Sequence, residues 1–504
     1  MLWIVHVVLA VLVLLASIAY RSVISEPQSY LSYIQDLSLV DPDAAPIALP
    51  PRFIPLYGDS LRHQRNMASG RPLAIVQEPA SQGAKLSLAF FGREPRLFLH
   101  DGRLAARLIG MEMESVGLDP FRKSRFSVMY PKSLITSYGE DWKRYKTLFR
   151  PMFDSSMTPD YYKIITGLVE DELNHQSCPE VDFAELFKIL AARVIGACAF
   201  GNRFDDPEDA KRVAQANTAM FGETAKYMTT IAAQLPALRL IPTAQKRRAM
   251  DAAEECRNIV GDLIDDRENG DSSPGTTQPD FAQNVINGMK SGVVTRKEAL
   301  DNSSLLVVAG HETTAYTMSW MAAIFATNDE IYKKCREEVR RIMGDNRVAT
   351  LEQIKQMHYL MATKTETLRL FPPIAFIERL CKVPFKIADG VVLRPGTSLT
   401  VDVFSIHHDQ RLWEEPDVAK PQRHLDQDTG KFKAPEAFKF MPFSGGPRQC
   451  PGQNFATREI MLVWSFILRN FDIEWSSDQD FSMLLGITIA PKNPIKGRIQ
   501  PIAE

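Results

Sequence analysis

The segment FSGGPRQCPGQNFA, residues 443–456, decides how the rest of the chain is interpreted. It carries the pattern F-x-x-G-x-R-x-C-x-G, which average residue usage would produce by chance in such a chain with a probability on the order of 10⁻⁴. Glycines in this loop let the backbone turn tightly and approach a flat ligand. Its N–H groups can point at the sulfur of Cys450, and Arg448 can pair with a carboxylate. The alternative is a glycine-rich turn with an incidental cysteine.

The segment resembles the haem-binding signature of the cytochrome P450 superfamily, in its eukaryotic, membrane-anchored (microsomal-type) form. Every fixed position is filled, and the resemblance covers roughly residues 50 to 504. It implies haem b as cofactor, with Cys450 as the axial iron ligand; a thiolate ligand favours cleavage of the O–O bond. The other signature positions that it implies for haem binding are Phe443, Gly446, Arg448 and Gly452.

A second matching stretch is AGHETT, Ala309–Thr314. Ala309 and Thr313 are four residues apart and share a helix face, and Gly310 leaves room beside the backbone for a diatomic ligand. Thr313 can hydrogen-bond such a ligand, while Glu312 can pass protons inward from solvent. Alone, these residues are more often structural. Their position relative to the cysteine segment favours Glu312 and Thr313 as catalytic residues.

The resemblance also assigns residues to structure and to the haem carboxylates. It implies that Glu366, Arg369 and Arg423 form a buried charge cluster, and that Arg379 contacts a haem propionate.

Trp142 and the residue four positions later match a further propionate site, where the family usually has arginine. Here Lys146 takes that place. A lysine neutralises a carboxylate as a point charge, without the two-pronged fork of arginine, so this contact is expected to be looser.

The chain begins with an apolar stretch at residues 2–20, about 28 Å long as a helix, against a hydrocarbon core of about 30 Å. No charge precedes it and Arg21 is the first cation, which favours a signal-anchor with the remainder in the cytosol. A cleaved signal peptide is the alternative. We therefore divide the chain into a transmembrane anchor (1–20), a proline-rich linker (21–58) and a haem-binding domain (59–504). The scattered cysteines fit a reducing compartment.

Apolar spacing of three and four predicts helices over most of the chain, and short β-rich stretches surround 72–100 and 376–402. The expected fold class is mainly α with a smaller β-rich region, the cytochrome P450 fold preceded by one transmembrane helix. The helices are predicted at 158–175, 180–200, 246–268, 296–326, 328–343, 351–370 and 453–470.

These features predict a monooxygenase that inserts one oxygen atom into a small apolar substrate, a secondary metabolite (terpenoid, polyketide or similar) or a lipid. No nucleotide-binding fingerprint is present, so electrons come from outside, from an NADPH-dependent cytochrome P450 reductase, with cytochrome b5 as a further partner. The expected location is the endoplasmic reticulum membrane, in contact with its lipid. The net charge of −2 argues against nucleic acid. A haem-thiolate isomerase or dehydratase and a non-catalytic haem sensor remain alternatives.

Four further interpretations complete the prediction. The basic stretch Lys143–Arg150 is either a solvated helix face or a docking surface for the reductase. Asn302 begins a glycosylation sequon that a cytosolic helix leaves unused, and a surface turn is favoured over a metal site at His407. By resemblance, the substrate-facing segments are 115–130, 225–245, 305–313, 374–378 and 485–488.

Overall fold

The structure of the protein is a computed structural model. The described residues are 47–48, 66, 73–91, 94–112, 115–118, 126–127, 129–154, 159–174, 180–201, 207–228, 241–270, 280–388 and 391–502. The predicted anchor at residues 1–20 lies outside these ranges. Within them, every helix is too short or too polar to cross a membrane.

Most of the described chain is helical, as the sequence predicted. The longer helices are α4 (Ala74–Ser81), α5 (Gly102–Gly110), α7 (Gly139–Asp154), α8 (Pro159–Asn174), α9 (Phe183–Phe200), α10 (Pro207–Met228), α12 (Ala244–Asn269), α13 (Phe281–Lys290), α14 (Arg296–Thr327), α15 (Asp329–Met343), α17 (His358–Leu370) and α19 (Gln453–Asn470). Shorter ones are α16 (Leu351–Gln356), α18 (Val403–His407) and the 3-10 turns η3 (Pro421–His424) and η4 (Gly446–Arg448).

The strands form a smaller β region built around one mixed sheet in the order β1-β2-β3-β9-β6-β4. Its strands are β1 (Ile47–Ala48), β2 (Leu86–Phe91), β3 (Glu94–Leu99), β4 (Val116–Gly117), β6 (Phe376–Cys381) and β9 (Ser398–Asp402). Three smaller sheets contain β5 (Glu180–Asp182), β7 (Phe385–Ala388), β8 (Val391–Leu393), β10 (Phe471–Trp475), β11 (Met483–Leu485), β12 (Ile489–Pro491) and β13 (Lys496–Pro501). β1 lies inside the predicted linker, so part of that segment pairs with the sheet.

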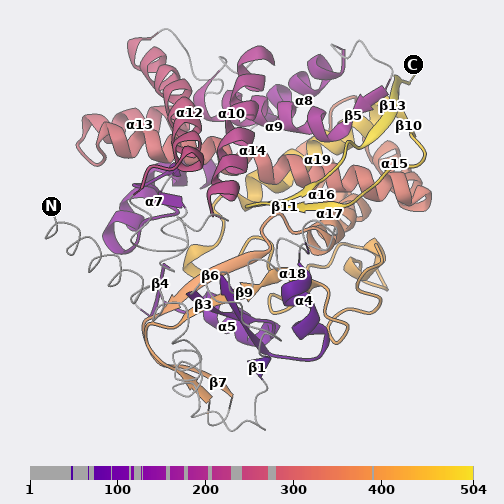
Figure 1. Cartoon of the computed structure of the whole chain (residues 1–504). Helices are drawn as coiled ribbons and strands as arrows, with labels where there is room; N and C mark the ends of the chain where they lie inside the picture. Colours follow the sequence, from indigo (N-terminus) through magenta and orange to yellow (C-terminus); the bar gives the residue numbers. More distant parts are fainter. Residues whose placement is uncertain are drawn as a thin grey trace, which may run out of the picture.

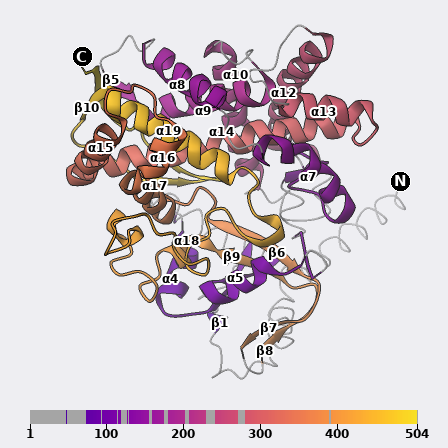
Figure 2. The same ribbon diagram turned by 180° about the vertical axis from the view of Figure 1, so that it is seen from behind.

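Most of the long helices lie in one half of the molecule together with the β10-β13-β5 sheet, and the six-stranded sheet lies in the other half together with α4, α5 and α18 (Figures 1 and 2). A large apolar core joins α8, α9, α14 and α19, while a second core, including Leu97 and Leu399, lies under the sheet and α5. Burial of these apolar surfaces is the main force that holds both halves together.

Helix α14 runs through the helical half and is buried along most of its length, about 48 Å for 32 residues. A capping box starts it: the Thr295 hydroxyl accepts from the Glu298 N–H, and the Glu298 carboxylate accepts from the Thr295 N–H. Glu298 also accepts hydrogen bonds from Tyr145 (2.7 Å) and Arg144 (3.0 Å) of α7. Burial opposes ionisation of Glu298, but these donors lower its pKa to about 2. The helix is thus fixed to α7 at its first turn.

Several boundaries differ from the predicted ones. The helix predicted at 351–370 is two helices, because Met357 has a non-helical backbone (φ −78°, ψ 72°). The β-rich stretch at 72–100 begins with helix α4, and the helix predicted from residue 180 begins with strand β5. Helices α5, α7, α10 and α13 were not predicted individually.

Candidate active site

Cys450 lies in a tight loop just before α19. Its N–H donates to the carbonyl of Phe443 (2.9 Å), which closes the loop, and η4 occupies the intervening turn. Gly446 has φ +60°, and a β-carbon there would lie 2.5 Å from the carbonyl oxygen of Ile109 in α5. Only glycine satisfies both the backbone conformation and this close approach.

The Cys450 thiol opens onto a cavity of about 320 Å³. Desolvation by the surrounding protein raises the pKa of the thiol, while the Gly452 N–H donates to the sulfur and opposes this rise. That N–H provides the loop-to-sulfur hydrogen bond expected from the sequence. Cys198, Cys256, Cys335 and Cys381 are all buried elsewhere.

The cavity gathers most of the predicted site residues. Trp142, Lys146, Thr313, Arg379, Phe443, Arg448, Cys450 and Gly452 all line it. Glu312 and Gly446 do not. Gly446 instead shapes the loop from behind, against α5. These positions agree with the predicted roles in location; the roles themselves stay predictions.

Three cations border the cavity. The Lys146 ammonium and the Arg448 guanidinium each lie 4.9 Å from the centre of the Trp142 ring, so this indole contacts both charges. Arg448 also donates to the carbonyls of Leu134 (3.1 Å) and Ser137 (2.5 Å). Arg379 donates to the Ser444 hydroxyl (3.3 Å). The cavity wall therefore carries three positive charges.

These residues fit the predicted haem. A thiol at one end of an otherwise mainly apolar cavity supplies a soft ligand for iron, and the bordering cations suit the two carboxylates of the porphyrin. Cys450 would hold the metal, and Trp142, Lys146, Arg379 and Arg448 would hold the carboxylates. Lys146 takes the place at which the family usually has arginine, so it would contact a haem carboxylate through a single charged group.

On the α14 side, Ala309, Gly310 and Thr313 line the cavity. The Thr313 hydroxyl donates to the Ala309 carbonyl (2.8 Å), one turn earlier. A β-carbon at Gly310 would lie 2.8 Å from Cδ1 of Ile195 in α9. A side chain at position 310 would therefore clash with α9, while Gly310 itself still lines the cavity; its role in leaving space for a diatomic ligand stays a prediction.

Glu312 lies away from the cavity and is 3% exposed. Its carboxyl accepts a hydrogen bond from the Thr488 hydroxyl (3.1 Å). Burial raises the pKa of Glu312 to about 8. The side chain thus holds a proton near neutral pH, as a proton donor must, without touching the cavity.

Sequence reasoning missed one buried acid in the cavity wall. Glu459 of α19 is 1% exposed, and desolvation raises its pKa well above the ordinary range, despite a hydrogen bond from Thr314. The sequence could have indicated Glu459 by its position nine residues after Cys450. A helix that begins just after the Cys450 loop brings this residue back to the side that faces the cavity.

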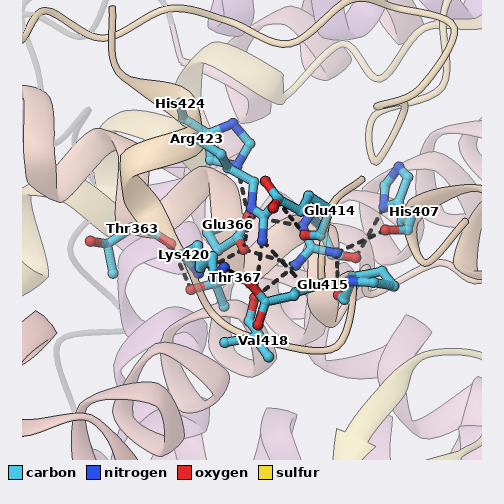
Figure 3. Close-up of polar contacts among 12 residues, drawn as sticks. Thr363, Glu366, Thr367, His407, Glu414, Glu415, Val418, Lys420, Arg423 and His424 are labelled. Atoms are coloured by element: carbon cyan, nitrogen blue, oxygen red, sulfur yellow. Dashed lines mark hydrogen bonds and ion pairs between the residues drawn. The ribbon is translucent and has the colours of Figure 1, made fainter. Parts of the chain in front are cut away.

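The predicted charge cluster of Glu366, Arg369 and Arg423 is present, and Figure 3 labels Glu366 and Arg423 within it. Arg369 binds both carboxylate oxygens of Glu366 (2.8 Å each), and Arg423 adds a third contact (3.0 Å). The sequence did not predict the fourth member, His424, whose Nε2 lies 2.8 Å from Glu366. These residues fix α17 to η3.

His407 is buried in α18, not on a surface turn as expected. Its Nε2 accepts from the Met441 N–H (3.0 Å), and desolvation lowers its pKa to about 3. The described residues contain no cluster of three metal-binding side chains.

Asn302 is also buried. Its amide donates to the Lys132 carbonyl (3.2 Å) and accepts from the Leu134 N–H (2.9 Å), so it anchors a cavity-lining loop and cannot accept a glycan in the fold.

Of the predicted substrate-facing segments, three reach the cavity. They contribute Leu118, Leu305, Leu306, Ala309, Gly310, Thr313, Ile374, Phe376 and Ile377. Residues 485–488 are absent from the lining, and no described residue of 225–245 contributes to it. Leu485 packs against the helical core instead.

Comparisons with known proteins show which chains this sequence resembles. The family model "Cytochrome P450" matches residues 49–496. Cytochrome P450 3A6 of Oryctolagus cuniculus is 27% identical over 81% of this chain and 83% of its own length. A cytokinin hydroxylase of Arabidopsis thaliana is 23% identical over 84% and 82%, respectively. Cytochrome P450 3A29 of Sus scrofa is 25% identical over 90% of each chain.

Proposed function

Because this chain belongs to the cytochrome P450 family and is a haem-thiolate monooxygenase, we propose that it oxidises a small apolar molecule with electrons from an NADPH-dependent reductase. The observation that supports this most directly is the cavity, in which the Cys450 thiol and Thr313 share a space with mainly apolar walls. Apolar walls with few polar groups bind ligands largely by excluding water.

The haem, when bound, supplies the chemistry by which one oxygen atom of dioxygen enters the substrate and the other leaves as water. The protein positions the substrate and supplies protons. Leu305, Ile374 and Phe376 would hold the substrate and exclude water, and the hydroxyl of Thr313, which lines the cavity, would donate a proton into it. Glu312 holds the proton that would replace it.

The substrate proposed is a terpenoid, polyketide or similar secondary metabolite, or a lipid. The apolar lining supports this class, and the apolar stretch at residues 2–20 supports an enzyme moored at the endoplasmic reticulum membrane, where such substrates dissolve. Reductase docking at the basic face of α7, with cytochrome b5 as a further donor, belongs to the same proposal.

The central assignment is tested by Cys450→Ser. The ferrous wild-type protein with carbon monoxide should show the red-shifted Soret band of thiolate ligation, and the variant should lose it. Haem binding without that band in the wild type, or an unchanged spectrum in Cys450→Ser, would remove Cys450 as the ligand.

A second measurement separates the monooxygenase from an isomerase, a dehydratase or a sensor. Reductase and NADPH are supplied with candidate substrates, and NADPH consumption is compared with oxidised product. Product formation that needs NADPH supports the proposal. Conversion without NADPH would identify an isomerase or dehydratase, and tight binding without turnover a sensor.

A further inference from the structure

Glu312 is held by a residue far away in the sequence. The Thr488 hydroxyl donates to Oε2 of Glu312 (3.1 Å), and both side chains are buried, at 8% and 3% exposure. The cavity lies on the neighbouring face of α14, lined by Ala309, Gly310 and Thr313. The contact therefore acts on the buried acid without occupying the cavity.

Thr488 has a defined place because its segment is bonded on both sides. It closes the turn between β11 and β12, where the Gly486 N–H donates to the Thr488 carbonyl (3.0 Å). The next residue, Ile489, donates to the carbonyl of Pro373 in the cavity wall (2.9 Å). Its own carbonyl accepts from the Trp320 indole on α14 (3.3 Å). The hydroxyl is thus presented to Glu312 by a braced hairpin.

Among the described contacts, the Thr488 hydroxyl is the only hydrogen-bond donor to Glu312. Burial raises the pKa of Glu312, whereas the Thr488 hydrogen bond and the charge of Lys188 on α9 lower it. Lys188 is itself paired with the half-exposed Glu185. The other titratable groups near Glu312 are His311 and Tyr316 on α14 and Tyr130 on the segment before α7.

We propose that Thr488 is a positioning residue for proton delivery: its hydroxyl holds the Glu312 carboxyl and stabilises the carboxylate left when the proton moves toward the cavity. The inference rests on the monooxygenase function. The proton leaves the Glu312 carboxyl for the Thr313 hydroxyl as that hydroxyl passes its own proton to the reacting group in the cavity, the Thr488 hydrogen bond stays on Oε2, and a proton from solvent restores the acid. No electrons move in this step, so charge and atoms balance at Glu312.

The test compares Thr488→Val, which removes the hydroxyl at nearly constant volume, with Thr488→Ser, which retains it. The readout is the infrared carbonyl band of protonated Glu312, assigned by its loss in Glu312→Gln and followed against pH in the ferric, haem-loaded protein. Loss of one hydrogen bond to the carboxylate should raise the titration midpoint by about 0.5 to 1 unit, about three- to tenfold in proton affinity. Thr488→Ser should restore the wild-type midpoint.

Turnover supplies a second readout. A weaker acid delivers protons more slowly, so Thr488→Val should form less product per NADPH and show a larger solvent isotope effect. In a Glu312→Gln background the same substitution should change neither quantity. Thr488→Ala is used instead if valine impairs haem loading.

The inference is overturned if Thr488→Val titrates like the wild type, or if its effect on turnover persists without Glu312. Failure of the proposed function is distinguishable, because the infrared titration needs neither substrate nor reductase. A protein that oxidises nothing tested would still report whether Thr488 sets the proton affinity of Glu312.

Discussion

The conformation of the Cys450 loop depends on the absence of a side chain at Gly446. Its backbone has φ +60°, and a β-carbon would meet the Ile109 carbonyl oxygen at 2.5 Å and the Gly110 Cα at 3.0 Å. Both are backbone atoms, which cannot rotate aside. The adjacent Gly445 is extended (φ −169°), and its β-carbon would meet only the Ile109 side chain, at 3.2 Å. Two neighbouring glycines therefore differ sharply in their tolerance of substitution.

We expect Gly446→Ala to destabilise the haem-loaded fold by about 2–4 kcal/mol, from the left-handed backbone and the clash together. Gly445→Ala, the matched control, should cost less than about 1 kcal/mol because a side chain can shift. Thermal unfolding and the yield of the carbon monoxide band measure both. Equal behaviour of the two variants would contradict this account.

Ion pairs of Glu366 hold α17 against η3. The Glu366 carboxylate receives hydrogen bonds from Arg369, Arg423, His424 and the Lys420 N–H, all at 2.8–3.0 Å. Burial raises the pKa of this carboxyl, but the donors outweigh it and lower the pKa to about 2. Because the charged form is favoured in the fold, ionised Glu366 stabilises the protein above pH about 4.5 and that contribution is lost as the pH falls toward 2.

Glu366→Gln should therefore cost about 3–5 kcal/mol at pH 7, because it leaves a buried guanidinium without its counter-charge. The deficit should shrink as the pH is lowered from 4.5, where the wild type loses the same charge. Urea unfolding at several pH values measures the difference. Glu352→Gln, at an exposed pair on α16, is the control and should change stability little. A deficit that does not vary with pH would argue against an ionised Glu366.

At the level of elements, long periodic segments could be predicted, and contacts between distant segments could not. The expected helices at 246–268, 296–326 and 453–470 lie within two residues of α12, α14 and α19. Strand β5 exists because it pairs with β13, which no local pattern reveals. The same holds in the site. Cys450 sits in a local motif, whereas Glu312 meets Thr488 across 176 residues and Glu366 meets His424 across 58.

Over the whole molecule, the basic stretch of α7 is only partly available to a partner. Arg144 is bonded to Asp141 and Glu298, and Lys146 lines the cavity. Lys143 remains 59% exposed at the surface, in a solvated pair with Glu140. The Arg150 side chain lies outside the described part of the structure. Any electrostatic docking on α7 therefore relies on few charges, and salt should weaken it readily.

We expect reduction by the reductase to slow with increasing ionic strength. Lys143→Glu should lower the rate about three- to tenfold at low salt, and the difference should disappear at high salt, because an exposed charge acts mainly on association. Lys334→Glu is the matched control, an exposed and similarly paired lysine on α15, which lies across the molecule from α7 (Figures 1 and 2). Stopped-flow reduction measures the rates. Equal effects of the two substitutions would place docking elsewhere.

The cavity wall has two origins, and this division has an evolutionary consequence. One part comes from α14 and the Cys450 loop, and the other from short segments that carry Leu134, Ile374 and Phe376. Inherited changes in the second part would alter which molecules fit, while the reacting groups stay in place. Asn302 limits that freedom, since it fastens the loop of Leu134 to α14 of the same molecule.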